Sequence, residues 1–167
     1  MDIYEFAMEK EKYSETYYRQ LAGKTKFAGL KNILTMLADE EVKHYNTVSL
    51  MKAGTPPTTV TETPVLADAE RAFEKMRVSA EKFRFDISEA ELYREARDIE
   101  RESKRYYLQK TREVEDPAQK DIFLRLAEEE NKHLLLVERL CDFVARPQTF
   151  LENAEMYHFD DYVDEPL

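Results

Sequence analysis

The chain has 167 residues, which is enough to bury the core of one domain, and 43% of them are apolar. A formal net charge of −10 argues against binding nucleic acid or an anionic membrane through a basic patch. Cys141 is the only cysteine, which excludes an intramolecular disulfide or a four-cysteine metal site within these residues. With neither a basic, apolar leader nor an apolar run long enough to cross a bilayer, we expect a cytoplasmic protein.

The first part of the chain is expected to form two helices. Apolar residues follow helical spacing over residues 2–22, and Asp2 with Glu5 forms a capping-box pattern at the start. A short break is expected at residues 23–27. A second helix is expected over residues 28–53, where a glycine and two prolines follow. Because the break is short, the two helices should form an antiparallel hairpin.

The second part repeats this plan after a long connection. Residues 54–64 form a stiff polar linker, and residues 65–83 have a helical pattern. A third main helix is expected to begin at Asp86 or Ser88, since both positions fit a capping box. A fourth begins with Pro117 at its first position.

The pattern of short, long and short connections predicts an all-α fold, a four-helix bundle with one long crossover. We expect the bundle to occupy residues 1–146. Its two hairpins lie at about residues 2–53 and 86–145, joined by the crossover at 54–85. Residues 147–167 are expected to form a tail that packs on the bundle or on a partner subunit.

The tail mixes large apolar groups with acids. A solvated tail rarely carries as many apolar groups as Phe150, Leu151, Met156, Tyr157 and Phe159. We therefore expect the tail to contribute to packing and the chain to form a homodimer. Four acids should mark the return of the chain to solvent: Asp160, Asp161, Asp164 and Glu165.

One set of four residues occurs twice, and each member of the second copy lies 89 positions after its counterpart. The pattern is Glu-x6-Tyr-x22-Glu-x2-His. The first copy consists of Glu11, Tyr18, Glu41 and His44, and the second of Glu100, Tyr107, Glu130 and His133. The surrounding sequence repeats in the same register, which favours a functional constellation over chance in a chain rich in glutamate.

The repeated residues suit metal binding. Glutamate and histidine three positions apart share one face of a helix. Burying four carboxylates together is too costly unless cations neutralise them. Carboxylate and imidazole ligands favour iron or manganese, with zinc as another possibility. The sequence therefore predicts a dinuclear site with six metal ligands: Glu11, Glu41, His44, Glu100, Glu130 and His133.

Tyr18 and Tyr107 lie seven residues after the first glutamate of each copy and share its helix face. They are candidate catalytic residues that would contact bound oxygen species or quench stray oxidants, although tyrosines are also common in helical cores. Ser14 and Ser103, three residues after those glutamates, are candidate hydrogen-bond donors to the ligands.

These motifs resemble the ferritin-like superfamily, and in particular the rubrerythrin-like di-iron proteins, over about residues 3–53 and 86–145. The resemblance implies two iron ions, each held by one glutamate and one histidine, with two further glutamates bridging them. The implied pairs are Glu11 with His44 and Glu100 with His133, and the implied bridges are Glu41 and Glu130.

Three features depart from known family patterns. The sequence lacks the four-cysteine rubredoxin domain of full rubrerythrins, so a separate protein would have to donate electrons. Ser103 stands where rubrerythrins carry an additional glutamate, which puts their redox-linked ligand exchange in doubt. Val42 stands where bacterioferritins place a haem-ligating methionine, so no haem is expected.

The expected function is the reduction of hydrogen peroxide or dioxygen at a carboxylate-bridged, non-haem di-iron centre. A ferroxidase, or an iron-binding protein that buffers iron without peroxidase turnover, fits the same ligands. A redox-sensing interaction module is a further alternative, suggested by the acidic, aromatic tail.

Overall fold

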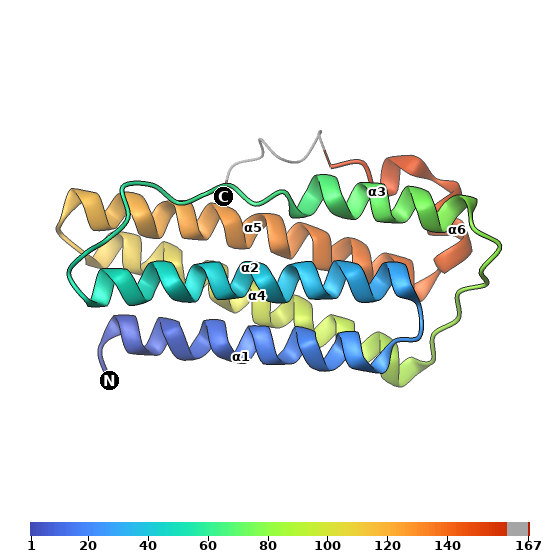
Figure 1. Cartoon of the computed structure of the whole chain (residues 1–167), viewed down its shortest axis with the longest axis horizontal. Coiled ribbons are helices and arrows are strands. Elements are labelled where there is room, and N and C mark those ends of the chain that lie inside the picture. The colour runs from blue at the N-terminus through green and yellow to red at the C-terminus, as the bar shows by residue number, and fades with distance from the viewer. Residues whose placement is uncertain (160–166) are drawn as a thin grey trace.

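The computed structural model describes residues 1–159 and residue 167, and every regular element in that part of the chain is helical. Four long helices lie side by side (Figure 1). They are α1 (Ile3–Lys24), α2 (Ala28–Lys52), α4 (Ile87–Glu113) and α5 (Pro117–Ala145). None of the described helices combines the length and apolar character needed to cross a membrane.

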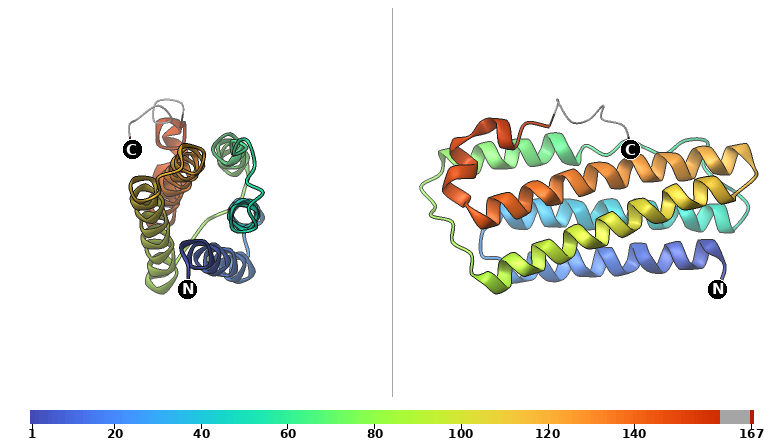
Figure 2. Two further views of the ribbon diagram at one scale, coloured as in Figure 1. Left: turned by 90° about the vertical axis from the view of Figure 1, so that its left-hand side faces the viewer. Right: turned by 180° about the vertical axis from the view of Figure 1, so that it is seen from behind.

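The four helices form two antiparallel hairpins. Helix α1 packs mainly on α2, and α4 packs mainly on α5. A long crossover, which contains α3 (Val65–Val78), joins the hairpins and places α3 beside α2 and α5 (Figure 2). This arrangement confirms the predicted all-α, ferritin-like bundle with an extra helix in the crossover.

Side-chain caps fix where the main helices begin. Half of the capping box predicted at α1 forms, because Asp2 accepts a hydrogen bond from the backbone N–H of Glu5 at 2.8 Å, whereas the Glu5 carboxylate pairs with Lys52 instead. At α4 the capping residue is Asp86, which forms a complete capping box with Glu89. Ser88, the other candidate, instead donates its hydroxyl hydrogen to Asp86 at 2.7 Å.

Two predicted helix ends are wrong. Helix α1 continues past residue 22 to Lys24, because Gly23 stays helical and the chain becomes extended only at Thr25. Helix α3 ends at Val78 rather than at residue 83, because Ser79 is extended. The non-helical segment that follows lets Phe83 pack into the end of the bundle, with its ring centroid 5.4 Å from that of Phe143.

A layer of polar side chains divides the apolar core into two clusters. The larger cluster joins one end of the bundle to α3 and includes Leu34, Phe73 and Phe143. The smaller cluster, at the other end, includes Val48 and Phe123. Because apolar packing closes the layer from both ends, its polar groups are held away from bulk water.

The tail begins with α6 (Pro147–Glu152), followed by a short 3-10 turn, η1 (Ala154–Met156). Phe150 and Tyr157 are fully buried. Their ring centroids lie 4.9 and 5.6 Å from that of Phe73 in the crossover. The tail therefore contacts the bundle of its own chain, whereas the bundle–tail boundary and the homodimer stay predictions. The four acids expected to return the chain to solvent lie outside the described residues.

Candidate metal centre

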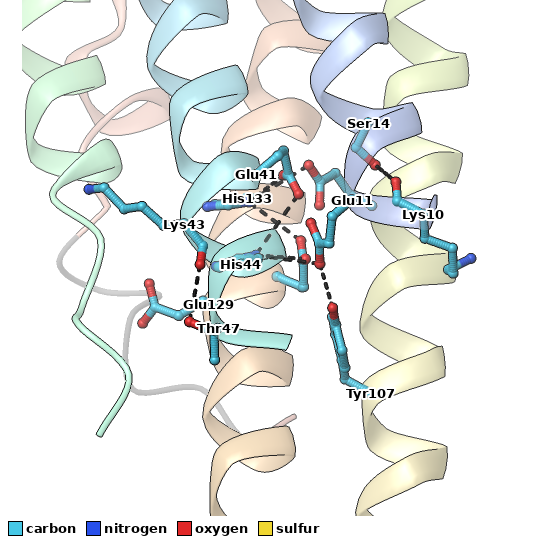
Figure 3. A network of polar contacts seen from close by, with 12 residues as sticks. Lys10, Glu11, Ser14, Glu41, Lys43, His44, Thr47, Tyr107, Glu129 and His133 are labelled. Carbon is cyan, nitrogen blue, oxygen red and sulfur yellow. Dashed lines mark hydrogen bonds and ion pairs between the residues drawn. The ribbon is translucent and has the colours of Figure 1, made fainter. Parts of the chain in front are cut away.

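The six predicted ligands meet in the polar layer between the two core clusters, and Figure 3 labels four of them, Glu11, Glu41, His44 and His133. Each of the four long helices contributes to the site, and none of the six side chains is more than 2% exposed. They are Glu11 on α1, Glu41 and His44 on α2, Glu100 on α4, and Glu130 and His133 on α5. The ligands of the two repeat copies, which are 89 residues apart in the sequence, therefore lie together in the fold.

His44 faces three of the four carboxylates through Nδ1. This nitrogen lies 3.0 Å from Glu130 Oε1, 3.7 Å from Glu11 Oε1 and 3.9 Å from Glu41 Oε2. Burial lowers the pKa of His44, but the charges of Glu130 and Glu11 outweigh it and raise the pKa well above its usual value. A metal ion would have to displace this proton, because only neutral imidazole is a ligand.

His133 repeats the arrangement from the other hairpin. Its Nδ1 lies 3.0 Å from Glu41 Oε1, 3.4 Å from Glu130 Oε2 and 3.8 Å from Glu100 Oε1. Burial lowers the pKa of His133, which favours the neutral ring. Glu41 and Glu130 therefore lie close to both histidines, and Glu11 and Glu100 each lie close to one. Two metal ions with two shared carboxylates fit this pattern.

The two histidine rings are stacked, with centroids 5.2 Å apart and planes inclined by 11°. One ligand atom from each of Glu41, His44, Glu130 and His133 lies within 4.8 Å of all the others. Atoms this close, carried by four buried side chains, are compatible with a shared metal site.

The carboxylate oxygens without a hydrogen-bond partner indicate whether metal ions fit this site. In the described part of the chain, one buried oxygen of each carboxylate has no hydrogen-bond partner. These atoms are Oε2 of Glu11, Glu41, Glu100 and Glu130. A buried carboxylate oxygen without a partner costs stability. Divalent cations would neutralise the four charges and give each oxygen a partner, so the residues fit a dinuclear centre.

The ionisation of the glutamates also shows that the cluster is short of positive charge. Burial and the neighbouring carboxylates raise the pKa of Glu41 and Glu100 well above the usual range. Burial and the charge of Glu11 raise the pKa of Glu130 to about 7. Burial acts on Glu11 as well, but a hydrogen bond with Glu41 and the charge of His44 outweigh it and lower its pKa to about 2. Without metal, protons must therefore take the place of cations.

Tyr18 and Tyr107 cross from one hairpin to the other. The hydroxyl of Tyr18 donates to Glu100 Oε1, and that of Tyr107 donates to Glu11 Oε1 at 2.5 Å. Burial and the nearby glutamates raise the pKa of both tyrosines, so both keep their protons as donors. Each tyrosine thus positions the glutamate that lies near a single histidine.

The repeat contains two further pairs beside the ligands and the buried tyrosines, Tyr17 with Tyr106 and Ser14 with Ser103. Tyr17 and Tyr106, which flank the buried tyrosines, donate at 2.6 Å to the carbonyl oxygens of Leu92 and Ile3, positions also 89 residues apart. These bonds join the hairpins. The prediction that Ser14 donates to a ligand is wrong, because its hydroxyl donates to the carbonyl oxygen of Lys10 on its own helix at 3.0 Å.

The sequence analysis missed two buried acids beside Glu41 and Glu130. Glu40 and Glu129 are only 5% and 4% exposed. Each lies within 3.0 Å of the lysine three residues later, and Glu129 also accepts the backbone N–H of Thr63 at 2.8 Å. The signal was present, because the glutamate–lysine pair repeats with the same offset as the ligands.

Comparison with known families agrees with the geometry. The family model described as Rubrerythrin matches residues 2–141, which include the first hairpin, the crossover and all of the second hairpin except the last residues of α5. The chain belongs to the rubrerythrin family. Searches of the curated proteins and of the solved structures gave no match. Membership of the rubrerythrin family and the buried glutamate–histidine cluster together support a non-haem di-iron protein.

Proposed function

We propose that this rubrerythrin-family protein binds two iron ions and reduces hydrogen peroxide or dioxygen, with electrons supplied by a separate donor protein. The observation that carries the proposal is the set of four buried, unpartnered carboxylate oxygens around two stacked histidines. A purely structural polar layer would satisfy these oxygens with hydrogen bonds. A layer that leaves one oxygen of every glutamate free is suited to cations.

The proposed ligand roles follow from the contacts. Glu11 with His44, and Glu100 with His133, would each hold one ion, while Glu41 and Glu130 would bridge the two. Two bound ferrous ions would supply the two electrons needed, with two protons, to convert one hydrogen peroxide into two water molecules.

Tyr18 and Tyr107 have a positioning role in this proposal. Each keeps a proton on its hydroxyl and fixes one oxygen of Glu100 or Glu11. The hydrogen bond to Oε1 fixes the orientation of the carboxylate. The second oxygen, Oε2, has no hydrogen-bond partner and would be free to bind an ion.

Ser103 favours a second candidate function, a ferroxidase or an iron-buffering protein. Its buried side chain, 3% exposed, stands where rubrerythrins carry an additional glutamate. A serine cannot replace a carboxylate as an exchanging iron ligand. The chain would then take up ferrous iron without sustained peroxide turnover.

The test is anaerobic loading with ferrous iron, followed by rapid mixing with peroxide or with oxygen. We expect two ions per chain and faster oxidation by peroxide. Faster oxidation by oxygen, with ferric mineral accumulating, would favour the ferroxidase. A double variant, Glu41→Ala with Glu130→Ala, should lose most of the bound metal, whereas Glu128→Ala, at an exposed position on α5, should not. Two tightly held ions in the double variant would contradict the assignment.

A further inference from the structure

A groove of about 430 Å³ lies between α1 and α4. All ten lining residues form five pairs, and the members of each pair are 89 positions apart, such as Ser14 with Ser103 and Tyr13 with Glu102. The groove is therefore centred on the approximate two-fold axis that relates the hairpins. The six candidate ligands are also repeat pairs, so the same axis passes through the metal centre.

The groove lies at the level of the ligands along the bundle. On α1 its lining includes Lys10 and Ser14, which flank Glu11 in the helix. On α4 it includes Ile99 and Ser103, which flank Glu100 in the same way. The groove and the two ligands Glu11 and Glu100 therefore share the same turns of α1 and α4.

Small side chains form the inner surface of this wall. Ser14 and Ser103 are 1% and 3% exposed. The hydroxyl of Ser103 makes no hydrogen bond to any residue among 1–159 or 167, although the residue is buried. An unpartnered hydroxyl that lines a groove is available to a polar or charged species passing through it.

The opposite end of the axis is covered. The crossover segment before α3 carries Val60, which is buried in the same core cluster as Val48 on α2 and Phe123 on α5. The backbone N–H of Thr63 donates to Glu129 on α5 at 2.8 Å. The α1–α4 side of the axis, where the groove lies, is not covered by this crossover segment.

The charge of the groove favours cations. Its lining carries four carboxylates and one ammonium group, Lys10, which gives a net charge of −3 (four negative and one positive). Asp98 and Glu102 lie 3.3 and 2.9 Å from arginines of their own helix. Glu9 and Glu95, on opposite sides of the groove, have no cationic partner in the described part of the chain. Such a negative cleft raises the local concentration of cations.

We propose that this groove is the access route by which divalent metal ions reach the buried carboxylates. Glu9 and Glu95 attract the ion, and Ser14 and Ser103 leave the gap through which it passes. The proposal rests on the proposed metal-binding function, but it concerns the rate of metal uptake rather than the chemistry of the loaded centre.

The first test blocks the gap. The metal-free protein is mixed rapidly with Co²⁺, and uptake is followed by the visible absorbance of the bound ion. Ser103→Leu should slow uptake and release together, by about tenfold or more, and leave the final stoichiometry unchanged. Ser103→Ala keeps the side chain small and should take up Co²⁺ at nearly the wild-type rate. A folded Ser103→Leu variant that takes up Co²⁺ at the wild-type rate would overturn the proposal.

The second test uses exposed positions, which do not endanger folding. Removing two negative charges from the groove with Glu9→Gln and Glu95→Gln should slow uptake about three- to tenfold at low salt and have little effect at high salt. The matched control, Glu115→Gln with Glu128→Gln, removes the same charge from exposed positions outside the groove. Equal slowing in both pairs would refute the route. A wild-type protein that binds no Co²⁺ at all would instead refute the proposed function.

Discussion

Substitution of Glu130 by glutamine should stabilise the metal-free protein and weaken the metal-loaded one. Glutamine has the same shape as glutamate and keeps an oxygen to face His44 Nδ1, which lies 3.0 Å from Glu130 Oε1. It removes one negative charge from a cluster of four buried carboxylates. In the proposed centre it also removes a bridging ligand, because an amide binds iron much more weakly than a carboxylate.

The magnitude follows from the pKa of Glu130, which burial and the charge of Glu11 raise from 4.5 to about 7. At pH values above 7 this shift represents a cost of about 3 kcal/mol in the folded state. A weaker interaction with His44 should cancel about 1 kcal/mol of the gain. The net gain of about 2 kcal/mol corresponds to a rise in melting temperature of roughly 4–8 °C for a chain of this length.

Bound metal should make the wild-type protein more stable than the Glu130→Gln variant. An ion present at a hundred times its dissociation constant stabilises the folded state by about 2.7 kcal/mol, so two ions contribute about 5 kcal/mol. The wild-type protein should gain this stabilisation and the Glu130→Gln variant should lose most of it.

The assay is thermal unfolding without oxygen, with and without Fe²⁺, at several pH values. The advantage of the metal-free variant should grow as the pH rises from 5 to 7, because over this range the unfolded chain releases the Glu130 proton and the folded chain keeps it. Glu128→Gln, an exposed change of the same charge, should have little effect. A metal-free Glu130→Gln variant that melts below the wild type, or equal stabilisation of both by metal, would refute the reasoning.

Three other outcomes are expected. Tyr107→Phe removes the 2.5 Å hydrogen bond to Glu11 and should weaken metal binding by about tenfold in a competition titration; a change of less than twofold would count against the positioning role. Truncation after Arg146 removes the buried ring of Phe150 and should lower the free energy of chemical unfolding by at least about 3 kcal/mol, with metal stoichiometry unchanged. An unchanged unfolding midpoint and an unchanged mass in light scattering would show that the tail supports neither the fold nor a dimer. Burial raises the pKa of Cys141 to about 11, so iodoacetamide at pH 7.5 should modify the folded protein far more slowly than the unfolded one; equal rates would contradict this burial.

The sequence by itself predicted the four main helices and the residues that gather at the centre. Local patterns carry this information. Helical periodicity places Glu41 and His44 on one face, a side-chain cap marks the start of α4, and the exact repeat pairs each ligand with a counterpart. Where local patterns were weak the prediction failed, as at the end of α3, where the aromatic residues pack without a helix.

The tertiary structure decided which partners these residues meet. Spacing along one helix could not show that Tyr107 donates across the bundle to Glu11, that Ser14 bonds to its own helix, or that Glu129 is buried beneath the crossover. It also could not show that a groove lined by five repeat pairs lies between α1 and α4, on the turns that carry Glu11 and Glu100. The physical reason is that helical periodicity fixes the face on which a side chain lies, whereas its partner depends on how that face packs against a helix far away in the sequence.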